Sequence, residues 1–331
     1  MRDFWTKLRA DVPGTFLAGL AVCVAFMGFV TWDQQHWWDS KQDYMFGYLV
    51  PFFVGYVIYD RWPGIVAALK VFGSEAGARV SGWRSWILNT LVFGTLVGGA
   101  LSFLFGALIR AATGATFPST LAISFGAGCL MMAVLFIATP ETKAATGVKL
   151  FEDARVKLTL LFLFPCFVWL VSAPMVSVIE QNLSLFLMGR VTTVVFFVFD
   201  TLGMPIEQQG NVLQLPGGAS VHVAEACSGI RSLTASLFVG SFLAAVFLKT
   251  FGKKVLLVFL AACLAFFTNL LRSLFLTVWA YNYGSEAIEG SVHDIGGFVV
   301  LGLTALGLMC LLPLFTLRIS FGGSAPVKKK E

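Results

Sequence analysis

The fold is decided by long apolar stretches, of which residues 255–280 are the clearest: VLLVFLAACLAFFTNLLRSLFLTVWA. Asn269 and Arg272 are the strongly polar residues in this stretch, and nearly all the others are apolar. An apolar helix needs about 20 residues to cross a bilayer, and this stretch is longer than that. It therefore predicts a transmembrane helix.

The composition of the whole chain has the same character. Of its 331 residues, 57% are apolar and only 12% are charged, and the mean hydropathy is +0.83. In a soluble globular domain about one quarter of the residues are charged, and a single core in water would not bury so much apolar surface. The composition excludes a soluble globular protein and predicts a protein that crosses a membrane several times.

Apolar runs of spanning length recur along the chain, at residues 12–30, 44–60, 86–109, 119–139, 158–180, 228–248, 255–280 and 295–317. They predict an all-α membrane protein with about eight transmembrane helices in a single domain over residues 1–331. The first run is too long for the apolar region of a signal peptide and lacks a small-residue cleavage site, so we expect a retained span. Residues 322–331 are predicted to be a disordered cytoplasmic tail.

Basic residues predict the orientation of these runs. Of the 23 lysines and arginines, 18 lie before the first run, after the last run or in every second loop. Cytoplasmic loops carry the excess of basic residues, so both termini are predicted to be cytoplasmic. The apolar segment 183–202 contains Arg190, and the charge pattern allows it an even number of crossings or none. We expect it to lie at the outer interface or to re-enter the membrane.

The remaining loops are expected outside. The first, from Trp32 to Asp43, contains two tryptophans that are predicted to anchor the chain at the membrane interface, Trp37 and Trp38. In the longest, apolar and polar residues alternate on each side of Gly217-Gly218, in NVLQL at 211–215 and ASVHV at 219–223. This alternation predicts a short β-hairpin that caps the outer face.

Three reactive residues are predicted to reach the same outer boundary. Cys227 lies at the outer start of the run 228–248, and His293, followed by Asp294, opens the last run from outside. Arg272 comes 18 residues after Lys254, so it has risen about 27 Å along a helix that enters from the cytoplasm. A thiol, a guanidinium and an imidazole are therefore expected to meet below the hairpin.

The sequence around Cys227 favours a functional role for the thiol. A helix start stabilises a thiolate, and Glu225, Ser228 and Gly229 interrupt the apolar sequence around it. The alternative is a cysteine that fills space among apolar side chains.

Arg272 and His293 each have a structural alternative. An arginine inside a span is costly and marks a function by default, but Arg272 could instead extend to the outer headgroups. Asn269, one turn earlier on the helix, could orient it. His293 could simply face water. Together with Cys227, the two residues supply a nucleophile, a fixed cation and an acid/base, as nucleophilic acyl chemistry requires.

No metal, cofactor or nucleic acid is expected as a partner. The six cysteines show no CxxC spacing, so neither a zinc site nor a disulfide framework is indicated. The net charge of +5 reflects which loops face the cytoplasm.

The residues around these three positions resemble a known family. The motif AEACSGIRSL at 224–233, followed by NLLR at 269–272 and HDIGG at 293–297, closely resembles the exosortase/archaeosortase family of integral-membrane transpeptidase-like enzymes. The segment DYMFGYLVP at 43–51 is similar to the N-terminal region of that family, and the resemblance extends from Trp37 to Leu312. Met45 and Phe46 replace a usual Ser-His pair, so we assign that segment no catalytic role.

The resemblance implies a cysteine transpeptidase of the bacterial plasma membrane, with Cys227 as nucleophile, Arg272 as basic partner and His293 as acid/base. It implies exported protein substrates with a C-terminal sorting signal, made of a short motif, a transmembrane helix and a basic cluster. It also suggests a link to exopolysaccharide export, with a site that faces outward among membrane lipids. The sequence does not identify the acceptor, which would be an amine or a glycan or lipid group.

Two alternatives remain at this point. A transporter or channel would use Arg272 and His293 to line a polar path, but it predicts ionisable residues in several spans, and the first four carry almost none. A membrane cysteine peptidase would hydrolyse the same substrate without transferring it, and the sequence does not separate these two outcomes.

Overall fold

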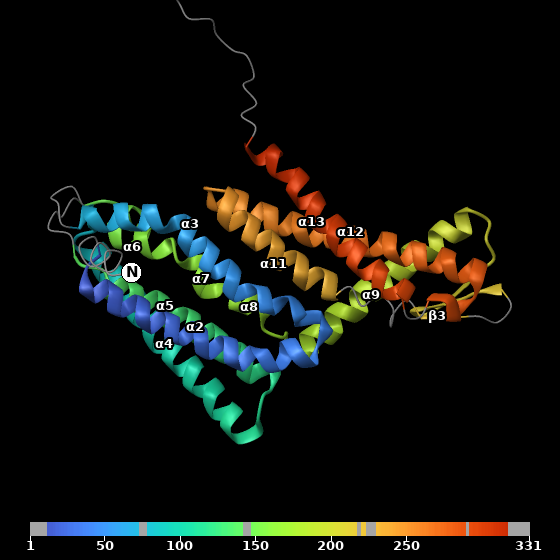
Figure 1. The fold of residues 1–331 in the computed structure, drawn as a ribbon, viewed down its shortest axis with the longest axis horizontal. Helices are drawn as coiled ribbons and strands as arrows, with labels where there is room; N and C mark the ends of the chain where they lie inside the picture. The colour runs from blue at the N-terminus through green and yellow to red at the C-terminus, as the bar shows by residue number, and fades with distance from the viewer. Residues whose placement is uncertain are drawn as a thin grey trace, which may run out of the picture.

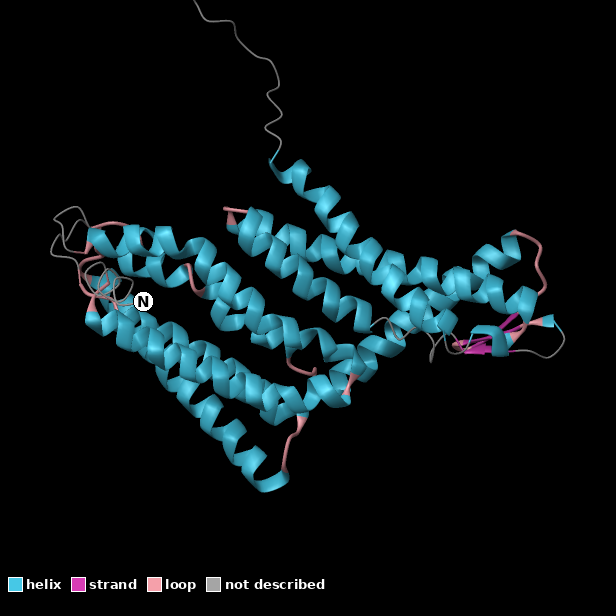
Figure 2. Cartoon of the chain, in the orientation of Figure 1, coloured by secondary structure: helices cyan, strands magenta, loops and turns pink. Residues whose placement is uncertain are grey.

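The computed structural model describes residues 12–72, 78–141, 147–216, 220–222, 230–288 and 291–316. Helices dominate this part of the chain, with one small sheet at the end of the molecule farthest from the N-terminus (Figures 1 and 2). The elements in chain order are α2 (Gly14–Ser40), η1 (Gln42–Leu49), α3 (Val50–Val71), α4 (Trp83–Thr113), α5 (Phe117–Ala138), η2 (Leu150–Glu152), α6 (Ala154–Leu160), α7 (Leu163–Phe167), α8 (Trp169–Ser172), α9 (Ser177–Thr201), β1 (Glu207–Gln209), β2 (Val212–Gln214), β3 (Ser220–His222), α11 (Ile230–Phe247), α12 (Phe251–Tyr283), η4 (Ser285–Ile288) and α13 (Ser291–Thr316).

The expected number of spans is confirmed. Among the described residues, seven helices are long and apolar enough to cross a membrane, and the bent pair of α6 with α7–α8 makes an eighth if it counts as one span. The membership differs from the prediction at two places, because α9, which was expected to lie at the interface or to re-enter, is among the seven, and α3 is not. Residues 44–60 form η1 and the first half of α3, and α3 is not among the seven because Asp60 and Arg61 interrupt its apolar sequence.

The predicted span 158–180 is broken, with a bend of 53° after α6. Pro165 has no backbone N–H, so it cannot donate to the carbonyl of Leu161 one turn earlier. Arg61 of α3 donates a hydrogen bond from Nη1 to this carbonyl instead. The carbonyl at the break therefore has a hydrogen-bond partner, since a side chain from another helix replaces the missing backbone donor.

The expected outer loop 32–43 is wrong, because α2 continues through Ser40. Trp37 and Trp38 are buried in the bundle and are not interfacial anchors. The Trp37 Nε1–H donates to Thr120 Oγ1 at 2.9 Å, and the Trp38 Nε1–H donates to the carbonyl of Ser172 at 3.3 Å. These partners lie on α5 and α8, so they hold the end of α2 in the bundle.

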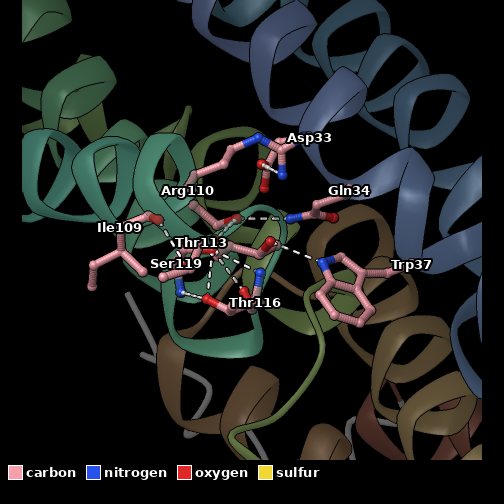
Figure 3. A network of polar contacts seen from close by, with 10 residues as sticks. Asp33, Gln34, Trp37, Ile109, Arg110, Thr113, Thr116 and Ser119 are labelled. Carbon is pink, nitrogen blue, oxygen red and sulfur yellow. Dashed lines mark hydrogen bonds and ion pairs between the residues drawn. The ribbon is translucent and has the colours of Figure 1, made fainter.

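A buried ion pair joins the end of α2 to the end of α4. Asp33 of α2 is fully buried, and its Oδ1 lies 2.6 Å from Nη1 of Arg110 at the end of α4 (Figure 3). The Arg110 guanidinium also lies over the ring of Trp32, 4.8 Å from its centroid. Because the two opposite charges neutralise each other, the pair is tolerated at a depth where one charge alone would be costly.

Segment 183–202 is one continuous helix, α9, so the predicted re-entrant turn is wrong. The segment that contains α9 nevertheless attaches at both of its ends to residues at the start of η1, Lys41 and Asp43. Glu180, near the start of α9, lies 3.7 Å from Lys41 Nζ, and Arg231, at the start of α11, lies 3.1 Å from Asp43. The chain therefore leaves and rejoins the bundle at the same end.

The predicted β-hairpin is present as β2 and β3, with Leu213 opposite Val221. A further strand, β1, extends it to a three-stranded antiparallel sheet in the order β1-β2-β3. Leu213 of this sheet packs in a second apolar core, formed with Phe199 of α9 and Ala280 of α12. The sheet is therefore fixed to the part of α12 that extends past η1.

Candidate active site

Arg272 is positioned by the longest helix of the described chain, the 33-residue α12. Its side chain packs against the second turn of α13, where two glycines leave room for it. A Cβ atom at Gly296 would lie 3.7 Å from Arg272 Nε, and one at Gly297 would lie 3.7 Å from Nη2. The guanidinium therefore lies directly on the backbone of α13.

Position 293 belongs to the same face of α13. His293 is in the first turn of the helix, three residues before Gly296 and four before Gly297. Residues at these spacings lie on one face of an α-helix. The side chains of His293 and Asp294 lie outside the described residues, so the structure places the helix turn that carries them and does not describe their contacts.

A cavity of about 520 Å³ joins Arg272 to the start of α11. Arg231 and Ser232, from the first turn of α11, line it together with Arg272 and Gly297. Cys227 is only three residues before Ile230, the first residue of this helix. Cys227 itself lies outside the described residues, as do its expected supporting residues, Glu225, Ser228 and Gly229.

The third wall of the cavity comes from η1, through Asp43, Met45 and Phe46. Asp43 fixes this wall to α11, because its Oδ1 accepts a hydrogen bond from Arg231 Nε at 3.1 Å. The Thr234 hydroxyl donates to the carbonyl of Asp43 at 3.2 Å. The sequence interpretation missed Asp43 and Arg231, although both lie inside the motifs that carry the family resemblance.

Tyr44 secures η1 from the other side. It is fully buried, and its hydroxyl accepts a hydrogen bond from the backbone N–H of Met175 at 3.0 Å. Burial raises the pKa of this phenol to about 12. Tyr44 therefore remains neutral at physiological pH and holds η1 against the segment that leads into α9.

The sequence model of the transmembrane exosortases matches residues 37–310, which is most of the chain. The chain belongs to the transmembrane exosortase family. No curated protein and no solved structure matches it. The family match identifies a membrane-embedded sorting enzyme that acts on exported proteins with sorting signals.

The cavity of this exosortase has an excess of positive charge. Arg231 and Arg272 contribute two guanidinium groups, and Asp43 is the one acidic residue in the described lining. The other walls are mainly apolar, as at Phe298 and Leu301 of α13. Such a site can hold a peptide segment and stabilise negative charge that develops on it, because charge interactions strengthen where water is excluded.

Asn269 is not among the residues that line the cavity containing Arg272. It is 3% exposed and lines a second cavity, of about 690 Å³, between α9, α11 and α12. Its Oδ1 is buried without a hydrogen-bond partner among the described residues. Whether it orients Arg272 stays a prediction. In the described part of the chain, no three His, Cys, Asp or Glu residues come together as metal ligands.

Proposed function

We propose that the exosortase cleaves the C-terminal sorting signal of exported proteins by acyl transfer through Cys227. The observation that carries the proposal is the position of Arg272, which lies on the α13 face that includes position 293 and beside the first turn of α11. This juxtaposition agrees with the family resemblance, which assigns roles to these same three positions.

In the proposed reaction, the Cys227 thiolate attacks the carbonyl carbon of the scissile peptide bond. Arg272 stabilises the negative charge on the carbonyl oxygen. His293 donates a proton to the departing amine as the C–N bond breaks, which leaves the acyl group on sulfur as a thioester. An acceptor amine or water then attacks the thioester and gives its proton to His293, and the thiolate departs.

The orientation of the site is part of the proposal. Nine of the fifteen described basic residues lie at the end of the bundle opposite η1, where α3 ends and α4 and α6 begin (Figure 1), or in the α11–α12 connection and the first turn of α12: Lys70, Arg79, Arg84, Lys149, Arg155, Lys157, Lys249, Lys253 and Lys254. By the positive-inside rule this end faces the cytoplasm, so the cavity of Arg272 faces outward.

Single cysteines placed at Glu207 and Lys253 test this orientation. A membrane-impermeant thiol reagent applied to intact cells should label position 207 in β1 and should reach position 253 only after the cells are opened. The single cysteines are introduced into a protein variant that lacks the exposed Cys263 and Cys310, so that labelling of native cysteines stays low. Labelling of position 253 in intact cells would contradict the orientation.

The nature of the product tests the function. An exported substrate with a C-terminal sorting signal, expressed together with the enzyme, should lose its transmembrane helix and basic cluster. Mass spectrometry of the new C-terminus should find a free carboxylate after hydrolysis or the added mass of an acceptor after transfer. A substrate that keeps its intact signal beside active, inserted enzyme would contradict the proposal.

A further inference from the structure

A second charged cavity lies toward the opposite end of the bundle, where no step of the proposed reaction takes place. It has a volume of about 560 Å³ and lies between α3, the α6–α7 break, α11 and α12. Arg61, Lys249 and Lys254 line it, and its apolar walls include Phe164, Phe167 and Val258. We call it the basic cavity.

The positive charge of the basic cavity is not neutralised by nearby carboxylates. Within the described residues, no acidic oxygen lies within 4.0 Å of a side-chain nitrogen of Arg61, Lys249 or Lys254. Asp60, next to Arg61 in α3, is exposed. Arg61 donates its hydrogen bonds to two uncharged backbone carbonyls, those of Leu161 and Ala245, and among the described residues Asp60 is the one acidic residue whose charge acts on it, against three cations in the cavity. The cavity therefore attracts an anion.

The walls of the basic cavity specify what kind of anion fits. Apolar side chains from α6, α7 and α12 continue from the cavity onto the outer surface of the bundle, where Leu160 is 39% and Val255 is 52% exposed. A free inorganic anion would gain nothing from such walls. A phospholipid would place its phosphate at the cations and its acyl chains along the apolar side chains.

We propose that the basic cavity binds the headgroup of an anionic phospholipid. Lys249 in the α11–α12 connection and Lys254 in the first turn of α12 hold the phosphate. Arg61 contributes charge and remains fixed by its carbonyl partners at the helix break. The lipid would join the α6–α7 break to the start of α12 and so connect the first half of the bundle to the helices that carry Arg231 and Arg272.

The test uses the purified full-length protein and native mass spectrometry in detergent. The probes are a phosphatidylglycerol, a phosphatidylcholine with the same acyl chains, and inorganic phosphate. Removing one basic residue near a lipid surface costs about fivefold in binding, since each contributes about 1 kcal/mol. The double variant Lys249→Gln/Lys254→Gln should therefore bind phosphatidylglycerol about 25-fold more weakly than wild type.

A matched control removes the same charge at the same end of the bundle. Lys149 and Lys157 are exposed and lie outside the basic cavity, so Lys149→Gln/Lys157→Gln should keep wild-type binding. The variant Lys249→Arg/Lys254→Arg keeps the charge and should retain the lipid, which separates loss of charge from loss of folding. Thermal unfolding without added lipid should be unchanged in all three.

Three results would overturn the proposal. They are equal retention of phosphatidylglycerol and phosphatidylcholine by the wild type, equal losses in the glutamine variant and its control, and displacement of the lipid by excess inorganic phosphate. Because the readout is lipid retention, it does not depend on substrate processing. Failure of the lipid site would therefore leave the proposed function untouched.

Discussion

Replacing Cys227 by alanine is expected to abolish substrate processing while the protein still folds and inserts. In the proposed reaction the Cys227 thiolate forms the covalent intermediate, and removing a catalytic nucleophile typically costs about 10⁴–10⁶ in rate. The measurement is the rate of signal cleavage, normalised to the amount of inserted enzyme.

Two other cysteines serve as controls for this change. Cys263 is exposed on α12, and Cys23 is buried in α2. Alanine at either position should leave processing near the wild-type rate. Normal processing by Cys227→Ala would contradict the interpretation as a cysteine enzyme and would favour the alternative of a transporter or channel.

Replacing Arg272 by lysine is expected to reduce processing by about 10²–10³, the usual loss when one oxyanion donor is removed. Lysine keeps the charge but loses the planar fork of donors, which matters if the guanidinium must reach an oxyanion in a fixed geometry. If Arg272 merely extends to the headgroups, lysine would serve equally well. Processing near the wild-type rate by Arg272→Lys would therefore assign the residue a structural role.

Gly297 provides an independent test of the same contact. The Cβ of an alanine there would lie 3.7 Å from Arg272 Nη2, an ordinary van der Waals distance, so Gly297→Ala should process substrate within a few fold of wild type. A leucine would extend into the space of the guanidinium and should reduce processing about as much as Arg272→Lys. Full activity of Gly297→Leu would show that the placement of Arg272 on α13 is not needed.

Much of the fold could be predicted because a bilayer restricts the choices. Apolar runs of sufficient length identified most of the helices, and the alternation around Gly217-Gly218 identified β2 and β3. The approach of Arg272 to the start of α13 followed from counting residues along one uninterrupted helix. These predictions succeeded because they depend on local sequence and on the fixed thickness of the membrane.

The errors arose where a distant partner decides the local structure. The sequence near Trp37 and Trp38 is typical of an interfacial loop, but hydrogen bonds to the distant Thr120 and Ser172 hold both side chains inside the bundle. The break after α6 depends on Pro165 together with Arg61, which is 100 residues from the carbonyl that it binds. Asp43 and Arg231, 188 residues apart, could not be paired without the folded chain.

A covalent acyl-enzyme on Cys227 is the most direct test of the central claim. The enzyme is mixed with substrate, quenched in acid and digested, and the peptide that contains Cys227 is examined by mass spectrometry. We expect this peptide to carry the new C-terminal segment of the substrate as a thioester that neutral hydroxylamine releases. Full processing without any adduct on Cys227, together with normal processing by Cys227→Ala, would contradict the account.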